Sequence, residues 1–437
     1  MAGASDKARF YLEKYVPELQ EYERKEIFTR DEISAIAGKR SDFEHILNAR
    51  GSKPSDYARY ATYEMNLDSL RKKRCTRLGV KGFKGYSGQR TVFFILDRAT
   101  KKSPGDMGLW MQYVQFCQKE NANKKLAKVF TSVLRLKPRE WGLWVLAAKW
   151  YSEQQGDMTT ARSYMQRGLR FCKEEKQLWV EYAKLEMVYL AKLAARRKIL
   201  GLGEDQKKQP QEDDGENMIR LPSITAADID PEASTDTEGV NEDALRRLAN
   251  APAYTGAIPL AIFDAAMKQF HDDPRVAEEL FALVAAFNDV PTTPHILQHI
   301  LSHLQQSAAN SSEAIICEAS LRLSGVDISS AAFPMDLAFS LKCINNGMAQ
   351  LSEKQKTALA EKATSMLLPY LERRDELDAD IDTVVVASLL RYLRVVSSGS
   401  ALAKSKDIRI LAERAKNEGA LTGADMLQRH LEAKKES

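Results

Sequence analysis

The sequence that decides the fold runs WMQYVQF at residues 110–116, WVLAAKW at residues 144–150 and WVEYAKL at residues 179–185. Trp110 and Trp144 are 34 positions apart, and the next copy begins 35 positions later. In each copy an apolar side chain returns every third residue, so these side chains form a stripe along one face of a helix. A period close to 34 residues is typical of stacked helix–turn–helix repeats, in which each stripe is buried against a neighbouring helix.

A second helix is expected about seventeen residues after the first Trp of each stripe. Its copies read AKVFTSVLR at 127–135 and ARSYMQRGLR at 161–170, and an earlier unit has RTVFFILDRA at 90–99 after the stripe YARYATY at 57–63. LAIFDAAMKQF at 260–270 is predicted to be the second helix of the fourth unit. The sequence therefore predicts an all-α protein, an α-solenoid whose helix-turn-helix repeats form a superhelix.

Composition divides the chain into four regions. We expect N-terminal helices at 1–40, repeats at 41–202 with a basic insertion at about 66–88, an acidic, disordered insertion at 203–257 and degenerate C-terminal helical repeats at 258–437. In the last region, helices are predicted at 274–287, 294–306, 312–323, 331–345, 352–370, 380–396, 404–417 and 423–435. Residues 204–243 hold 13 acidic and 3 basic residues, a net charge of −10 in a chain whose total is +4.

Overall composition is that of a folded protein, with 44% hydrophobic and 28% charged residues among 437. The first residues, Met1 to Lys7, contain no apolar signal segment, and no stretch of the sequence is apolar enough to span a membrane. We therefore expect an intracellular, soluble protein without a membrane partner. The five cysteines are widely spaced and form no C-x-x-C pair, so we expect buried thiols and neither disulfides nor a zinc site.

These motifs resemble a class of repeats and, more specifically, one protein family. The helix pattern W-x-x-Y-x-x-F/L-E, followed by A-R-x-V/Y-F/Y, resembles the HAT (half-a-TPR) repeats of RNA-processing scaffolds. More specifically, three segments are similar to the N-terminal signature of the U3 small nucleolar RNA-associated protein 6 family. These segments are RSDFEHILN at 40–48, PSDYARYATYEMNL at 54–67 and RKKRCTRLGVKG at 71–82.

The resemblance implies a function as well as a fold. It implies a scaffold subunit of the UTP-B subcomplex of the small-subunit processome, acting in the nucleus and nucleolus during processing of pre-ribosomal RNA. The implied partners are WD-repeat propeller subunits of UTP-B and, less directly, the U3 snoRNP and the pre-rRNA. The resemblance implies no cofactor and no small-molecule substrate.

The best candidate for a functional surface is the basic segment within the first unit. Phe83 and Tyr86 lie among its charges, and residues 69–96 include eight cations and no Asp or Glu. Three interpretations remain open: contact with RNA or the pre-ribosome through phosphates and stacked bases, contact with an acidic protein, or a solvated helix face. The candidate contact residues are Arg71, Lys72, Lys73, Arg74, Arg77, Lys81, Lys84 and Arg90.

The aromatic residues of the stripes have two possible roles, as a platform for stacking bases or as the core between repeats. Their periodic placement beside helices rich in small residues favours the core. The residues assigned to this core are Tyr57, Tyr60, Tyr63, Trp110, Tyr113, Phe116, Trp144, Trp150, Trp179 and Tyr182.

Catalytic and metal-binding motifs are weak in this sequence. His295, His299 and His303 recur every fourth residue, but the same helix has an apolar stripe and no nearby Cys or Glu ligand, so a boundary face is favoured over a metal site. The sequence has no P-loop, no H-E-x-x-H and no G-x-S-x-G, and we predict no catalytic, cofactor-binding or metal-binding residue. Two alternatives to the processome remain, a HAT-repeat scaffold in splicing or mRNA 3′-end processing and a stand-alone RNA-binding protein.

Overall fold

A computed structural model describes residues 4–49, 51–80, 88–199, 256–373 and 377–397. Every regular element in these ranges is an α-helix, which confirms the all-α prediction. The chain divides into two compact units, Met1–Tyr164 and Met165–Ser437.

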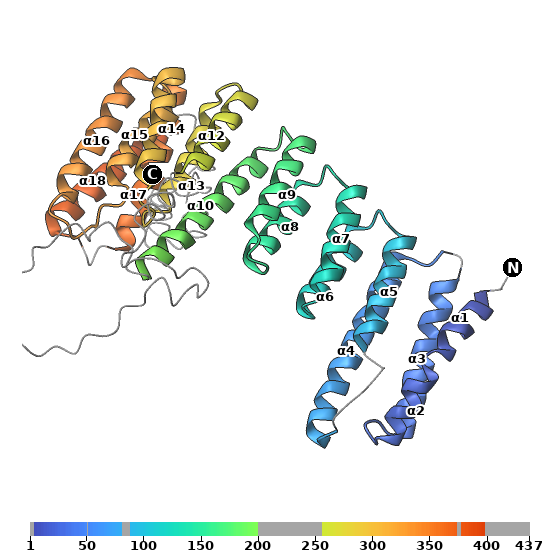
Figure 1. The fold of residues 1–437 in the computed structure, drawn as a ribbon. Helices are drawn as coiled ribbons and strands as arrows, with labels where there is room; N and C mark the ends of the chain where they lie inside the picture. The colour runs from blue at the N-terminus through green and yellow to red at the C-terminus, as the bar shows by residue number, and fades with distance from the viewer. Residues whose placement is uncertain (1–3, 50, 81–87, 200–255, 374–376, 398–437) are drawn as a thin grey trace, which may run out of the picture. The chain divides into compact units, whose positions relative to one another are not determined.

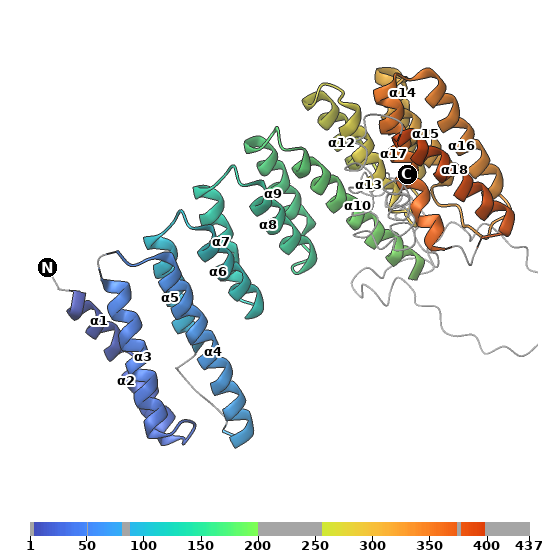
Figure 2. The same ribbon diagram turned by 180° about the vertical axis from the view of Figure 1, so that it is seen from behind.

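The first unit contains eight complete helices in its described residues and the start of a ninth (Figure 1). They are α1 (Ala4–Glu13), α2 (Val16–Arg24), α3 (Arg30–Asn48), α4 (Pro54–Leu78), α5 (Gly88–Lys102), α6 (Met107–Lys119), α7 (Asn123–Leu136) and α8 (Trp141–Glu153), followed by α9 (Met158–Phe171). Helix α1 packs on α3, α4 packs on α5 and α6 packs on α7, and the same neighbours are visible from behind in Figure 2. Helix α6 also contacts both α4 and α5, so successive pairs stack.

Local sequence signals explain where several of these helices begin and end. Thr29 accepts a hydrogen bond from the backbone N–H of Glu32, whose side chain accepts one from Thr29 N, and this capping box starts α3. The carboxylate of Asp106 caps α6 by accepting from Leu109 N. Helix α4 ends at Gly79, whose φ of 62° lies in the left-handed region that a glycine adopts without steric cost.

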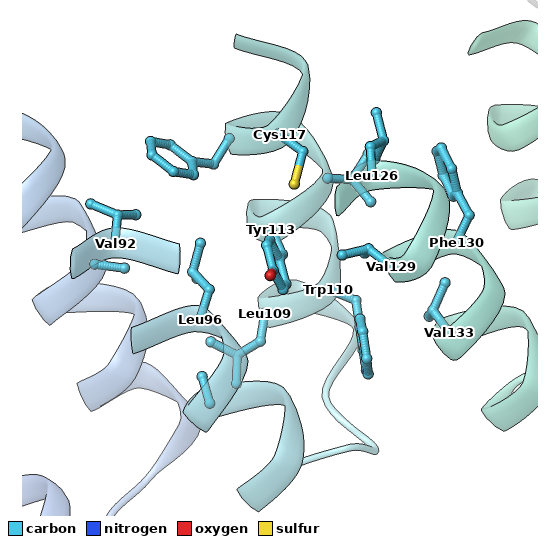
Figure 3. Packing of buried hydrophobic residues seen from close by; sticks show 14 of the residues in the cluster. Val92, Leu96, Leu109, Trp110, Tyr113, Cys117, Leu126, Val129, Phe130 and Val133 are labelled. Atoms are coloured by element: carbon cyan, nitrogen blue, oxygen red, sulfur yellow. The ribbon is translucent and has the colours of Figure 1, made fainter. Parts of the chain in front are cut away.

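The core of the first unit is built from the aromatic stripes. Figure 3 shows Trp110, Tyr113 and Cys117 of α6 between side chains of α5, such as Leu96, and side chains of α7, such as Phe130. Nearly all of the stripe residues are buried, and Tyr63 is half-buried. The buried ones are Tyr57, Tyr60, Trp110, Tyr113, Phe116, Trp144 and Trp150 in the first unit and Trp179 and Tyr182 in the second.

One hydrogen bond recurs in three repeats. The indole N–H of Trp110 donates to the carbonyl oxygen of Pro104 at 3.0 Å, and that of Trp144 donates to Pro138 at 2.9 Å. In the second unit the indole of Trp179 donates to the carbonyl oxygen six residues earlier at 3.1 Å. The Trp position thus combines a buried ring with a bond that fixes the loop before its helix.

The second unit continues with helices that contact each other in chain order. They are α10 (Lys176–Ile199), α12 (Ala257–Gln269), α13 (Pro274–Ala285), α14 (Thr293–Ala308), α15 (Ser312–Leu323), α16 (Phe333–Gln350), α17 (Glu353–Glu372) and α18 (Ala379–Ser397). Helix α12 packs on α10, as expected for the second helix of the fourth unit. The helices predicted between 274 and 396 are all present, with ends shifted by a few residues.

Some expectations fall on residues beyond the described ranges. The predicted helices at 404–417 and 423–435 lie there, as does nearly all of the acidic segment at 203–257. Of the basic insertion, residues 66–78 are the last turns of α4, and 81–87 are outside the description. Within the described ranges, none of the helices has the length and apolar character needed to cross a membrane. The five cysteines are free, and Cys117, Cys172 and Cys317 are buried.

Candidate nucleic-acid interface

The end of α4 contains part of the cluster of cations that the sequence indicates as a candidate contact surface. Two of its arginines, Arg71 and Arg74, form ion pairs within the protein. Arg71 is 8% exposed. Its guanidinium donates to Asp68 Oδ1 from Nη2 at 2.6 Å and from Nε at 3.1 Å. A guanidinium buried with its carboxylate is a structural group, because separating the two would leave an unpaired charge.

Arg74 joins α4 to the turn between α2 and α3. Its Nη1 and Nη2 donate to the two carboxylate oxygens of Glu32, both at 2.7 Å, and Nη1 also donates to the Ile27 carbonyl oxygen at 3.1 Å. The guanidinium carbon lies 4.7 Å from the ring centre of Phe28. Hydrogen bonding to Arg74, with that to the Thr29 backbone, lowers the pKa of Glu32 to about 2. Arg74 therefore stabilises the packing of the N-terminal helices on the first repeat.

Lys72 is half-exposed and bridges two carboxylates. Its Nζ lies 2.9 Å from Asp68 Oδ2 and 3.4 Å from Glu120 Oε2, and Glu120 is the C-cap residue of α6. This ion pair connects α4 to the next repeat. The positive charge of Lys72 is therefore largely balanced by these two carboxylates.

Three other cations of this segment face solvent. Lys73, Arg77 and Arg90 are exposed, and the structure gives them no ion pair with any described residue. Lys81 and Lys84 lie outside the described residues. A groove of about 540 Å³ beside Arg77 is also lined by Glu23 and Glu26, so it presents both signs of charge. The accessible charge on this part of α4 is therefore smaller than the sequence alone indicates.

A second basic surface, which the sequence reasoning did not single out, lies between α5 and α7. A groove of about 550 Å³ there is lined by Lys101 of α5 and by Lys124, Lys125 and Lys128 of α7. Its one acidic lining residue, Asp97, accepts hydrogen bonds from the Tyr113 hydroxyl and from Lys125 Nζ. We call this groove, with the four lysines that line it, the α5–α7 groove.

A periodic signal could have revealed that surface. Arg90 and Lys124 are 34 positions apart, and so are Lys101 and Arg135, so the second helices of two successive repeats have cations at equivalent positions. Helices α5 and α7 together contain eight Lys or Arg residues and one acid, Asp97. The 34-residue period places the apolar stripes on the buried side of the helices. The same period also orders the charges on the opposite, solvent-facing side.

A buried ion network lies beneath the N-terminal helices. Arg40 of α3 is 1% exposed, and its Nε and Nη2 donate to Glu64 of α4 at 2.8 and 2.9 Å. Its Nη2 lies 3.5 Å from Glu18 of α2, which accepts a hydrogen bond from Tyr22. Burial raises the pKa of the Glu64 carboxyl, against the opposing attraction of Arg40. This network joins three helices and is closed to solvent, so it has a structural role.

The histidines of α14 make separate contacts. His299 Nε2 lies 2.8 Å from Asp264, and His303 Nε2 lies 3.2 Å from Asp272. Both rings meet Phe263 edge-on, with centroid distances of 5.8 and 5.3 Å. In the described part of the chain no three His, Cys, Asp or Glu side chains gather in a way that could hold a metal ion. The arrangement is that of a helix boundary packed on its neighbour.

Comparison with known proteins finds a family model and several relatives that match part of the chain. Residues 12–95, which include the buried ion network and the end of α4, match the family model described as U3 small nucleolar RNA-associated protein 6. The Schizosaccharomyces pombe protein of that name is 38% identical over 199 residues, 45% of this chain and 41% of the relative. The human homologue is 35% identical over 186 residues, 42% of this chain and 31% of the relative.

A further homologue, from Dictyostelium discoideum, is 24% identical over 287 residues, 65% of this chain and 46% of the relative. Each of these matches spans less than half of the relative's own length. The family model and the fungal and human relatives agree, and their name is the one that the sequence motifs resemble. Over the matched part of its sequence, the chain is therefore similar to U3 small nucleolar RNA-associated protein 6.

Proposed function

We propose that the chain is a non-catalytic scaffold subunit of the nucleolar small-subunit processome, held in its UTP-B subcomplex and needed for processing of pre-rRNA and maturation of small-subunit rRNA. The observation that carries the proposal is the match of residues 12–95 and of 199 residues overall to U3 small nucleolar RNA-associated protein 6. The chain's helical pairs support it, because stacked helix pairs offer long surfaces for several partners at once.

The proposed partners follow from the family. WD-repeat propeller subunits of UTP-B would dock on the helical faces, and the chain would accompany the U3 snoRNP and the pre-rRNA in the nucleolus. We interpret the HAT repeats as the α-solenoid that presents these faces. The exposed cations at the end of α4, Lys73 and Arg77, are proposed to contribute to the particle contact.

Affinity purification of the tagged full chain tests this proposal. We expect co-purification of propeller subunits, U3 small nucleolar RNA and pre-rRNA, together with nucleolar fluorescence of the tagged protein. Recovery of spliceosomal proteins or mRNA 3′-end cleavage factors in their place would assign the scaffold to another pathway. Recovery of RNA without any protein partner would favour a stand-alone RNA-binding protein.

The contact at the end of α4 needs variants that spare the structural ion pairs. Replacing Arg71 and Arg74 would remove bonds to Asp68 and Glu32, so loss of the particle could then reflect loss of the fold. The double variant Lys73→Glu, Arg77→Glu changes exposed side chains only. We expect it to recover less U3 RNA than the control variant Lys39→Glu, Lys342→Glu, which alters the net charge equally at two other exposed positions. Equal recovery by the two variants would exclude the α4 contact and leave the scaffold role standing.

A further inference from the structure

The α5–α7 groove is lined by four lysines and one carboxylate. Lys101, Lys124 and Lys128 are exposed and have no ion pair with any described residue, whereas Lys125 is held by Asp97 at 2.9 Å. The groove's only carboxylate is thus already neutralised, and three ammonium groups face solvent around it. Three unbalanced cations that line one groove repel one another, and an anionic ligand would reduce that repulsion.

The position of two of these lysines adds to the local positive potential. Lys124 and Lys125 lie in the first turn of α7, where the helix macrodipole is positive and disfavours cations. The N-cap residue of α7 is Ala122, which offers no side-chain hydrogen bond to the helix. A sequence selected for helix stability alone would have Asp or Glu in that turn. Lys124 and Lys125 therefore lower the stability of α7, and this indicates that they have a role other than stabilising the helix.

The floor of the groove distinguishes between classes of ligand. Trp110, Tyr113 and Val129 are 5%, 2% and 5% exposed, and Leu136, which also lines the groove, is 50% exposed. The indole N–H of Trp110 and the hydroxyl of Tyr113 already donate to Pro104 and Asp97. A protein segment would need an apolar anchor in a pocket, and stacked bases would need an exposed ring. The rings of Trp110 and Tyr113 are buried, so the groove offers no stacking platform, and its lysines are the groups that can bind an anionic ligand.

We propose that the α5–α7 groove binds the phosphate backbone of RNA, with little dependence on base sequence, through Lys101, Lys124 and Lys128. Lysine is a compact point charge that binds phosphates without imposing a fixed geometry. Arg90 and Arg135, at the equivalent positions 34 residues from Lys124 and Lys101, extend the cationic face along the two helices. Positions 90 and 101 are eleven residues apart on α5, about 16 Å along the helix axis, so the face is long enough for several phosphates.

The inference rests on the proposed function, which brings the chain next to pre-rRNA. It is tested on purified full-length protein by measuring the affinity for a fluorescent oligo(U) strand and for an RNA duplex of equal length over a series of salt concentrations. The test variant is Lys101→Glu, Lys124→Glu, Lys128→Glu. The control variant Lys39→Glu, Lys268→Glu, Lys342→Glu has the same net charge and also changes exposed lysines.

We expect the test variant to bind both RNAs more weakly than the control and to reduce the slope of log K against log salt by about 2 on the single strand, since each phosphate contact contributes about 0.7. The ratio of the two affinities identifies the favoured RNA form. Equal affinities and slopes for test and control variants would overturn the inference. A poly-glutamate peptide that binds more tightly than either RNA, and is lost in the test variant, would assign the groove to an acidic protein and also overturn it.

The inference and the proposed function fail separately. If the tagged wild-type chain recovers no U3 RNA from cells, the processome role is wrong whatever the groove binds. If the wild type recovers U3 RNA while the test variant binds purified RNA as the control does, only the groove assignment is wrong.

Discussion

At the scale of single residues, the Arg40 side chain shows how a buried charge is paired with carboxylates from neighbouring helices. Its bidentate contact with Glu64 and its approach to Glu18 satisfy the charge from two helices, and its guanidinium carbon lies 4.5 Å from the ring centre of Tyr15. Desolvating an isolated guanidinium would cost far more than any packing gain. The three N-terminal helices α2, α3 and α4 are therefore stabilised as a set by this one side chain.

Replacing Arg40 by Ala should destabilise the first unit by about 3–5 kcal/mol, because Glu64 is then left as an unpaired buried carboxylate. The matched control is Arg59→Ala, which breaks an arginine–carboxylate pair whose arginine is 71% exposed and should cost about 0–1 kcal/mol. Urea unfolding followed by tryptophan fluorescence measures both. Similar costs for the two variants would show that the buried network contributes no more than a surface ion pair.

The Glu32–Arg74 pair predicts a dependence of stability on pH. The folded-state pKa of Glu32 is lowered to about 2 from an ordinary value of 4.5, so its stabilising contribution is complete above about pH 4.5 and is lost as the pH falls toward 2. In Glu32→Gln the amide can still serve the capping box but cannot form the ion pair. We expect the difference in urea midpoint between wild type and this variant to be constant above pH 5 and to shrink steadily below it.

Glu23→Gln is the control for that series, since Glu23 is exposed and has no ion pair with a described residue. Its difference from wild type should not vary with pH in the same way. A Glu32→Gln difference that grows on acidification would contradict the assignment, because it would require a raised pKa.

Sequence reasoning reached only part of this residue-scale picture. Asp68 is three positions before Arg71 on one helix, so that ion pair follows from helical spacing alone. The partners of Arg74, Glu32 and the Ile27 carbonyl, lie 42 and 47 positions away. No local pattern connects them. A run of cations in a sequence therefore overstates the charge available to a ligand whenever distant segments supply the counter-ions.

At the scale of elements, the Trp that opens each stripe has two tasks. Its ring fills the space between the helices of neighbouring pairs, and its N–H fixes the loop six residues earlier. The spacing of the Trp residues was sufficient to predict the helix and its buried face. The hydrogen bond could not be predicted, because it depends on the path of the loop before the helix.

Variants of Trp110 separate the two tasks. Trp110→Phe keeps a buried ring but leaves the Pro104 carbonyl oxygen without its donor, which should cost about 1–3 kcal/mol. Trp110→Ala also opens a cavity and should cost about 3–5 kcal/mol. Thermal unfolding followed by circular dichroism, on both variants, measures the difference. If Trp110→Phe lowers the stability as much as Trp110→Ala does, the hydrogen bond contributes more to stability than the buried ring. The assignment of Trp110 as mainly a core residue would then be wrong.

At the scale of the whole molecule, charge is distributed unevenly along the chain. Residues 204–243 have a net charge of −10 in a chain whose net charge is +4, so the other residues together have +14. The sequence predicted repeats that form one superhelix, and the chain divides into two compact units. The break was not foreseen because periodicity reports local helix pairs and contains no information on how tightly successive pairs pack.

Replacing residues 204–243 by a Gly/Ser linker of equal length tests what that uneven charge does. The variant chain has a net charge near +14 by the same count. The acidic residues that repel a polyanion such as RNA are then absent. We expect tighter binding to oligo(U) at low salt, chiefly through faster association, and a difference from wild type that shrinks as salt shortens the Debye length to about 10 Å at 0.1 M and less above it. A scrambled segment of unchanged composition is the control and should bind as the wild type does. Unchanged or weaker binding by the linker variant would mean that the acidic residues do not oppose RNA and that the cationic surfaces of the first unit act independently of them.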